Sequence, residues 1–409
     1  MNKLADLIDE HVDEIAKIET LDNGKGIAFS RGYDIPQVAI TLRYFAGFAD
    51  KLHGKVIETE GKLSYTRHEP IGVCAAIIPW NFPLMMAGWK LGPALCTGNV
   101  VVLKTSELTP LSALKLAEYV KEAGFPPGVI NIITGYGAVA GDRLARHPKV
   151  GKVAFTGSTA VGRMVMKASA ESNLKKVTLE LGGKSPNIIF NDADIEQAVK
   201  WAHKGIFFNH GQCCCAGSRV YVQEGVYDKF LEAFKAYTAQ TKVGDPFEED
   251  TFQGPQVSQV QYDRIMGYIK AGKEEGATCY MGGNRFGDKG YFIEPTVFTD
   301  VKENMKIMQE EIFGPVVAVS KFKDVDDVIE KAHDTAYGLA AAVFTSNITQ
   351  AITTANRLEA GTVWVNCYNE LDYNTPFGGY KQSGIGRENG EYALDNYVQI
   401  KAVKINVGL

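Results

Sequence analysis

The sequence predicts an α/β protein made of two doubly wound domains with a small β ribbon added. Short runs rich in β-branched residues alternate with helical patterns along most of the chain, and these runs are apolar throughout. Continuous apolar runs are typical of parallel strands that helices cover on both faces. The length of 409 residues is also that of two or three domains.

The first series of expected strands lies between residues 71 and 182. The runs are IGVCAAIIPW, GNVVVLK, GVINIITG, KVAFTGS and KVTLELGG. Between the second and third runs, apolar residues recur at helical spacing, at Ala113, Leu116, Ala117 and Val120. Strands that alternate with helices indicate βαβ units. We interpret residues 1–51 and 71–182 as a Rossmann-like, nucleotide-binding domain.

A second series occupies residues 183–397, with expected strands in SPNIIF, RVYVQ, VVAVSKF and GTVWVN. A helical stripe of Ile195, Ala198, Ala202 and Ile206 leads into a cysteine-rich loop, which would lie where the domains meet. Residues 52–70 and 398–409 fit neither series and are expected to be strands. We interpret them as a ribbon for self-association; ordinary edge strands are the alternative.

Composition excludes several classes of protein. The net charge is −5 and no basic stripe is interleaved with aromatic residues, so nucleic acid is not an expected partner. No apolar run approaches the roughly 20 residues of a membrane helix. The acidic, amphipathic start resembles neither a signal nor a transit peptide. The scattered, odd-numbered cysteines favour a reducing compartment. We therefore expect a cytoplasmic protein, with a mitochondrial location left open.

The loop NHGQCCCAGSR places Cys213, Cys214 and Cys215 side by side. Adjacent Cα atoms are about 3.8 Å apart, which is too close for an unstrained disulfide. Neighbouring side chains are expected to diverge, and the chain has no Cys-x-x-Cys or His-x-x-His pair, so no metal site is predicted. Two interpretations remain, namely three small buried hydrophobic residues or a nucleophilic cysteine in a turn.

Two glycine-rich segments could approach phosphates. GYGAVAG, residues 135–141, follows a strand, but its last gap is one residue too long for the dinucleotide pattern. In FTGSTAVG, Gly157 permits close backbone approach and Ser158 offers a hydroxyl where a helix begins. Lys104 and Glu107 leave another strand, and a carboxylate there favours NAD over NADP. The alternatives are tight turns and a solvated ion pair.

The motifs read together are more specific than any one of them. PWNFPL, LKTSE, FTGST, LELGGKSP, NHGQCCCAGSR, EEIFGPV and PFGGYKQSGIGRE occur in this order. This ensemble resembles the aldehyde dehydrogenase superfamily along essentially the whole chain, and is most similar to its NAD-dependent, broad-specificity members. The family signature F-x-N-x-G-Q-x-C-x-A places the nucleophile at Cys214.

The resemblance implies oxidation of aldehydes to carboxylic acids through a hemithioacetal and a thioester on Cys214. Glu180 is the implied general base, and Asn81 is implied to hold the oxyanion together with the Cys214 N–H. The implied NAD-binding residues are Ile78, Trp80, Lys104, Glu107, Gly137, Gly157, Ser158, Leu181, Glu311 and Phe313. The implied aldehyde-binding residues are Phe82, Met86, Trp89 and Phe377. Leu371 stands where relatives often carry an aromatic residue, which leaves the preferred aldehyde open.

Family members normally begin well upstream of the segment at Met1, so the cofactor domain is expected to be incomplete at its N-terminus. The resemblance also implies a homo-oligomer, either a dimer or a tetramer. Two other functions stay open. One is a hydrolase or acyl transferase that uses the same cysteine thioester. The other is a non-catalytic, structural or NAD-binding protein.

Overall fold

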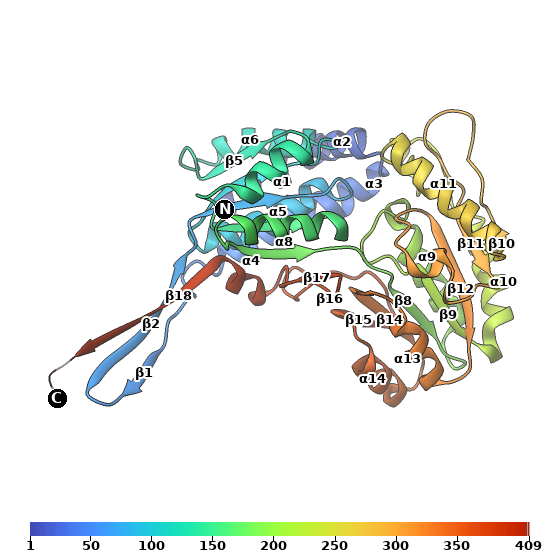
Figure 1. Ribbon diagram of the computed structural model, residues 1–409. Coiled ribbons are helices and arrows are strands. Elements are labelled where there is room, and N and C mark those ends of the chain that lie inside the picture. Colours follow the sequence, from blue (N-terminus) through green and yellow to red (C-terminus); the bar gives the residue numbers. More distant parts are fainter. Residues whose placement is uncertain (407, 409) are drawn as a thin grey trace.

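The computed structural model describes residues 1–406 and 408, and it contains two α/β units and a projecting β ribbon (Figure 1). The chain begins with helices that pack on the first unit: α1 (Asn2–Glu10), α2 (Val12–Asn23), α3 (Ile27–Phe29), a π-helical turn (Ser30–Asp34) and α4 (Ile35–Ala46). Within the described part of the chain, no helix is both long and apolar enough to cross a membrane.

The first unit contains a six-stranded sheet in the order β17-β7-β6-β3-β4-β5. Its parallel strands are β3 (Val73–Ile77), β4 (Val100–Lys104), β5 (Ile130–Ile133), β6 (Lys152–Thr156) and β7 (Lys176–Glu180). The helices that connect them are α5 (Pro83–Cys96), α6 (Leu111–Glu122), α7 (Asp142–Arg146) and α8 (Thr159–Ser172). The predicted alternation of strands and helices is therefore confirmed.

The sixth strand of this sheet comes from the far end of the chain. β17 (Gly384–Ile385) pairs antiparallel with β7, with Gly384 opposite Glu180. These residues fall inside the 183–397 range that the sequence assigns to the second domain. Local patterning gave no sign of this return, because a two-residue strand has no measurable period.

The second unit contains a seven-stranded sheet in the order β10-β11-β12-β9-β8-β14-β15, parallel except at β10. Its strands are β8 (Pro186–Ile189), β9 (Arg219–Gln223), β10 (Thr278–Met281), β11 (Thr296–Thr299), β12 (Val316–Phe322), β14 (Ala340–Phe344) and β15 (Thr362–Val365). Its helices are α9 (Ile195–Phe207), α10 (Tyr227–Thr238), α11 (Gln259–Glu274), α12 (Lys306–Gln309), α13 (Val325–His333) and α14 (Ile348–Arg357). A short pair, β13 (Tyr337–Gly338) and β16 (Tyr380–Lys381), lies apart from this sheet.

Three strands form the ribbon at the lower left of Figure 1: β1 (Val56–Thr59), β2 (Lys62–Pro70) and β18 (Val398–Asn406). Both segments predicted to be strands outside the two series therefore pair with each other, although residues 407 and 409 lie outside the described part. β18 pairs antiparallel with β2 along its whole length. Apolar and polar residues alternate in β18, but this pattern does not produce a buried face, since Ile400 is 70% exposed.

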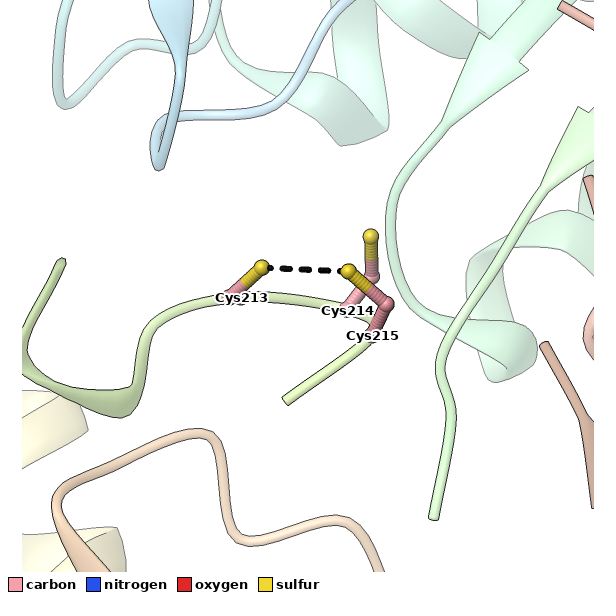
Figure 2. Close-up of side chains that lie close together, drawn as sticks. All are labelled: Cys213, Cys214 and Cys215. Carbon is pink, nitrogen blue, oxygen red and sulfur yellow. Dashed lines mark hydrogen bonds between the residues drawn. The ribbon is translucent and has the colours of Figure 1, made fainter. Parts of the chain in front are cut away.

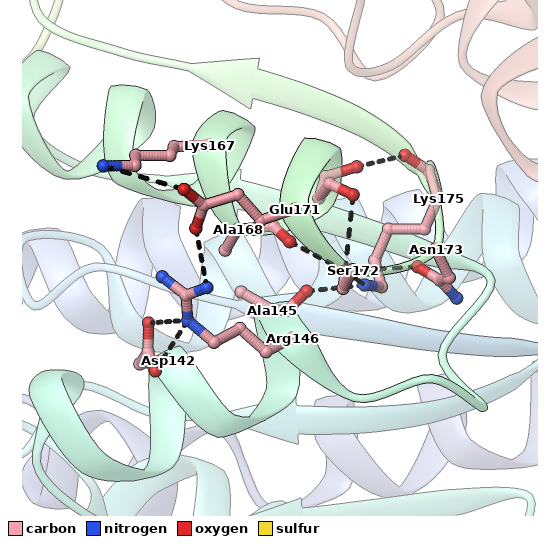
Figure 3. A network of polar contacts seen from close by, with 10 residues as sticks. Asp142, Ala145, Arg146, Lys167, Ala168, Glu171, Ser172, Asn173 and Lys175 are labelled. Carbon is pink, nitrogen blue, oxygen red and sulfur yellow. Dashed lines mark hydrogen bonds and ion pairs between the residues drawn. The ribbon is translucent and has the colours of Figure 1, made fainter.

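Helices α7 and α8 share a buried apolar cluster that includes Ala145, Val165 and Ala168, and polar contacts add to it at the surface (Figure 3). Arg146 pairs with Asp142 and with Glu171, while Lys175 donates to the Ala145 carbonyl at 2.6 Å. Because the ion pairs are exposed to solvent, each adds little stability, typically below about 1 kcal/mol. These contacts lie near the C-terminal end of α8, and its N-terminal end borders the site described next.

Candidate active site

A cavity of about 130 Å³ lies between the carboxyl ends of the first sheet's strands and the cysteine loop. Crevices at this edge of parallel sheets are usual binding sites. The cavity is lined by every predicted catalytic and aldehyde-binding residue and by part of the predicted cofactor set: Trp80, Asn81, Phe82, Met86, Trp89, Gly157, Ser158, Glu180, Cys214, Glu311, Phe313 and Phe377.

Five predicted cofactor residues do not line this cavity: Ile78, Lys104, Glu107, Gly137 and Leu181. Four of them lie at or just beyond the carboxyl ends of β3, β4 and β7. The Lys104 ammonium is 3.0 Å from the Glu107 carboxylate, and that carboxylate is partly open to solvent. Gly137 begins a π-helical turn, not the phosphate loop of the dinucleotide pattern. Their roles therefore remain predictions.

The cysteine loop is held in an unusual backbone conformation. Directly after α9, Asn209 and His210 have φ of 48° and 60°, which non-glycine residues adopt at a cost of about 1–3 kcal/mol. Two bonds hold this shape. His210 Nε2 accepts the Gly254 N–H at 2.9 Å, and Gln212 Oε1 accepts the Val257 N–H at 3.1 Å. The strain is thus balanced by contacts with a distant segment.

The three cysteines do not diverge as the sequence led us to expect; that prediction is wrong. A turn, closed by the Ala216 N–H donating to the Cys213 carbonyl at 3.1 Å, brings all three sulfur atoms within 4.8 Å of one another. Cys213 Sγ and Cys215 Sγ are 3.5 Å apart, and the Cys214 sulfur stands apart from that contact (Figure 2). Cys214 is half-buried while its neighbours are buried. All three cysteines line the cavity, and Cys214 is the most exposed of them.

Glu180 ends β7 and projects into the same cavity. The residue is 2% exposed, and its Oε1 atom has no hydrogen-bond partner in the described part of the chain. Burial raises the pKa of Glu180 to about 8, opposed by the charge of Lys90 and by a hydrogen bond with the Cys214 thiol. Hydrogen bonds with Cys213 and Cys215, burial and the Glu180 charge raise the pKa of Cys214. The Cys214 thiol therefore needs a base to accept its proton. The Glu180 carboxyl group, which is itself only weakly acidic because its pKa is raised, borders the same cavity.

Lys90 and Glu388 lie close enough to Glu180 for their charges to act on its pKa, and no role was assigned to them from the sequence. Lys90 is fully buried; its ammonium pairs with Glu388 and donates to the Thr156 hydroxyl at 2.8 Å. One signal could have found Lys90, since it is the only charged residue in the apolar helix α5, which is buried almost all round. Glu388 is the last residue of the PFGGYKQSGIGRE segment, but only the fold brings it to Lys90.

Hydrogen bonds between amide groups hold Asn81 in place. Its Nδ2 donates to the Gln212 carbonyl at 3.0 Å, and the Asn209 side chain donates to the Asn81 carbonyl at 2.9 Å. From the end of α2, Asn23 Nδ2 donates to the Trp80 carbonyl at 2.6 Å. Since an amide nitrogen carries two hydrogens, Asn81 keeps a second donor beside the thiol.

Gly182 and Gly183 make room for the site. A Cβ on Gly182 would lie 2.3 Å from the Glu311 carboxylate, and one on Gly183 would lie 2.4 Å from the Cys214 carbonyl. Glu311 accepts the Gly183 N–H at 3.1 Å, and burial raises its pKa to about 7. The two glycines of the LELGG motif therefore serve close packing against both the cysteine loop and Glu311.

Gly183→Ala is expected to reduce activity strongly, because the new methyl group displaces the backbone of Cys214. A loss of roughly 100-fold in kcat is the expected scale for a misplacement of about 1 Å. The matched control is Gly267→Ala in α11, where a Cβ meets nothing within 4 Å. The control should keep full activity and gain about 0.5–1 kcal/mol of stability from its better helix propensity. Equal kcat in both variants would contradict this account; the measurements are steady-state kinetics and thermal unfolding.

Aromatic rings form the walls of the cavity. Edge-to-face pairs join Trp89 to Phe377 at 5.5 Å and Trp80 to Phe313 at 5.2 Å between centroids. Leu371 also lines the cavity, as do six residues that the sequence analysis did not single out: Tyr33, Met85, Phe208, Gln261, Arg264 and Asn369. Gln261 and Arg264 come from α11, which no local motif links to the cysteine loop. Such contacts arise only from tertiary packing.

The fold and the cavity define a two-unit α/β protein with a cysteine, a carboxyl group and an amide gathered at one sheet edge. Residues 1–403 match the aldehyde dehydrogenase family, and the chain belongs to that family. It is 63% identical over 409 residues to an aldehyde dehydrogenase of Alternaria alternata, covering 100% of this chain and 82% of that protein. A mitochondrial aldehyde dehydrogenase of Mesocricetus auratus is 57% identical over 408 residues, with the same shares covered.

The solved structures agree with this assignment. The NAD⁺ complex of an aldehyde dehydrogenase from Bacillus cereus has a TM-score of 0.98 and 52% identity to this chain. The match covers 99% of this chain and 83% of that one. The mixed α/β fold with parallel sheets is therefore that of an NAD-binding oxidoreductase family.

Proposed function

We propose that this protein oxidises aldehydes to carboxylic acids with NAD as cofactor, using Cys214 as nucleophile. One observation carries the proposal. Cys214, the least buried residue of the cysteine cluster, and the buried carboxyl group of Glu180, whose Oε1 has no hydrogen-bond partner among the described residues, border the same cavity. An aldehyde has no leaving group, so its oxidation requires a nucleophile that adds to the carbonyl carbon first.

In the first step Glu180 accepts the proton of the Cys214 thiol as the sulfur attacks the aldehyde. Hydrogen bonds with Cys213 and Cys215, together with burial, raise the pKa of the Cys214 thiol, and burial raises the pKa of Glu180, so free thiolate is scarce at neutral pH. The charge of Lys90 keeps part of Glu180 ionised at neutral pH. The aromatic walls exclude water and hold the aldehyde's apolar part.

Negative charge then develops on the aldehyde oxygen of the hemithioacetal. The free N–H of Asn81 and the Cys214 backbone N–H are the donors we assign to it. Donors fixed before the reaction stabilise such an oxyanion, and the loss of one costs roughly 10²–10³ in kcat. The Asn23, Asn209 and Gln212 contacts supply that fixation.

The residues present fit a dinucleotide. Gly157 and Ser158 directly precede the 14-residue helix α8, which Ser158 caps, and this helix N-terminus borders the cavity and favours a phosphate. Glu311 is a buried carboxylate placed to accept ribose hydroxyls, and Glu107 with Lys104 offers a second ribose site. When bound, NAD supplies the hydride acceptor. The residues of the chain orient the hemithioacetal and then promote hydrolysis of the thioester, which releases the acid.

Glu180 releases its first proton to solvent, and in the last step it takes a proton from the water that hydrolyses the thioester, while Cys214 leaves as the thiolate and is reprotonated. This step separates oxidation to the free acid from acyl transfer to another acceptor. Its test is NADH formation, followed by absorbance, with purified protein, NAD and a panel of short and aromatic aldehydes. Aldehyde-dependent NADH together with an equal amount of free acid supports the proposal. A folded, NAD-binding protein that releases neither favours the non-catalytic alternative.

We further propose that the ribbon joins copies of this chain. One face of its tip carries Val56, Leu63, Tyr65, Val403 and Ile405, which the strand register places opposite or next to one another. Val56 is 77% exposed and the outer edge of β18 is unpaired, and both features are typical of an association surface.

The double variant Leu63→Lys/Ile405→Lys is expected to form smaller assemblies than the unaltered chain, because it places two cations at the tip. Sedimentation equilibrium measures the change. A control on the opposite face of the ribbon, Lys404→Glu, should leave the mass unchanged. An unaltered assembly in the double variant would exclude the ribbon as the contact.

The compartment is a smaller proposal. All seven cysteines are free, which suits a reducing compartment such as the cytoplasm. Fractionation of the source cells with an antibody to this chain tests it, and a mitochondrial signal would overturn it.

A further inference from the structure

The hydroxyl group of Tyr33 is a polar group on the cavity wall that the proposed chemistry does not use. Tyr33 belongs to the π-helical turn Ser30–Asp34, is half-buried and lines the cavity. Burial, and after it the charge of Asp34, raises the pKa of Tyr33, and none of the main causes is a hydrogen bond. The hydroxyl therefore has no partner among the described residues and is free to bind a ligand.

Aromatic rings surround this hydroxyl group. The ring of Tyr33 meets the edge of Phe208 at 6.1 Å between centroids, and Phe208 stacks on Phe82 at 6.0 Å. An aldehyde that fills this part of the cavity displaces water from the Tyr33 hydroxyl. If the aldehyde carries no polar atom there, the hydroxyl is left unpaired, which costs free energy; an oxygen atom at that place restores the hydrogen bond.

We propose that Tyr33 selects aldehydes with an uncharged oxygen atom away from the carbonyl group, such as an ether or hydroxyl oxygen, by donating a hydrogen bond to it. This inference rests on the proposed aldehyde oxidation and narrows its substrate class. Cys214 and Asn81 are assigned to the carbonyl group. Tyr33 comes from a separate segment, before α4, and so meets the remainder of the aldehyde.

Charge favours an uncharged oxygen over a carboxylate. Among the described residues that line the cavity, Arg264 is the single basic one. It comes from α11 and donates to the carbonyl of Glu311, a residue assigned to the cofactor, at 3.1 Å. A carboxylate at the far end of the aldehyde would be buried beside aromatic rings without a cation, which is costly. An ether or hydroxyl oxygen avoids that cost.

The test compares two aldehydes of equal size. An ether oxygen in 3-methoxypropanal replaces a methylene group of pentanal, and Tyr33→Phe removes the hydroxyl but keeps the ring. The ratio of kcat/KM for 3-methoxypropanal to that for pentanal should fall about 10-fold in Tyr33→Phe, the scale of one hydrogen bond between neutral groups. Differences in intrinsic reactivity between the two aldehydes cancel in this comparison. An unchanged ratio would overturn the proposal, and so would a higher kcat/KM for 4-oxobutanoate, which ends in a carboxylate, than for pentanal.

Tyr44→Phe is the matched control. Tyr44 lies on α4, packs against Phe45 and Phe48 and does not line the cavity. Its loss of a hydroxyl should leave the ratio of the two kcat/KM values unchanged. An equal fall in both variants would show that the effect does not arise in the cavity, and would overturn the role of Tyr33.

A second measurement needs no turnover. The alcohols 3-methoxypropan-1-ol and pentan-1-ol are compared as protectants of Cys214 against alkylation by iodoacetamide, which mass spectrometry follows. The ratio of their half-protecting concentrations should change about 10-fold between the unaltered chain and Tyr33→Phe. The same ratio in both would overturn the selection by Tyr33. Absence of NADH from every aldehyde would instead contradict the proposed function, and the protection experiment would still decide the role of Tyr33.

Discussion

Cys214→Ser is expected to lower aldehyde oxidation by about 10³-fold or more, the scale on which loss of a covalent nucleophile acts. A serine hydroxyl is far less acidic than a thiol, and the Glu180 carboxylate beside it is too weak a base to ionise it. The measurement is steady-state NADH formation at saturating aldehyde, with NAD binding followed separately by calorimetry. NAD affinity should change little, because the substituted atom faces the aldehyde part of the cavity.

The neighbouring cysteines supply the control for this result. Cys213 and Cys215 are buried and have no place in the proposed chemistry. Their serine variants should lose far less activity than Cys214→Ser, through packing alone. If Cys214→Ser keeps more than a tenth of the activity while Cys213→Ser loses it, the nucleophile has been assigned to the wrong sulfur.

Glu180→Gln is expected to have the second largest effect, a loss of roughly 10²–10³ in kcat, which is typical of a general base. The two steps that use Glu180 should separate. At high pH, which increases the small fraction of thiolate that the raised pKa of Cys214 allows, a burst of at most one NADH per chain should form before turnover nearly stops at the thioester. Rapid-mixing absorbance measures the burst, and quenched samples should carry the acyl group on Cys214.

The pH profile gives an independent reading of the same residue. Burial raises the pKa of Glu180 to about 8, and only its ionised form accepts protons. The rate of the unaltered protein should therefore rise as the pH increases through about 8, and Glu180→Gln should lack that rise. A profile that persists in Glu180→Gln would assign the titration to another group.

Much of the fold could be predicted because its strands are buried on both faces. Such strands read as continuous apolar runs, and the helices between them read at a period of 3.6 residues, so the alternation of β3 to β7 was visible. The return of β17 to the first sheet was not, because two residues carry no period. For the same reason, local patterns could not show that the range 183–397, which the sequence assigns to the second domain, contains a strand of the first sheet.

The residues of the site also differ in whether local sequence could predict them. Asn81, Glu180 and Cys214 each stand in a motif at the end of a strand or helix, and parallel strands place such ends at one edge of a sheet. The ion pair of Lys90 with Glu388 joins residues that are almost 300 positions apart, and no motif links them. The convergence of three adjacent sulfur atoms depends on the backbone dihedral angles of the loop, which residue types alone do not determine.

The pairing of β17 with β7 has a consequence for how the protein is made. Gly384 lies opposite Glu180, although 204 residues separate them in the sequence, so the strand that carries the base gains its last neighbour only after residues 384–385 have been synthesised. Contacts of such sequence separation form late and slowly. A nascent chain that lacks residues 384–385 therefore holds Glu180 on an open sheet edge, and this part of the active site is completed only after that segment has been made.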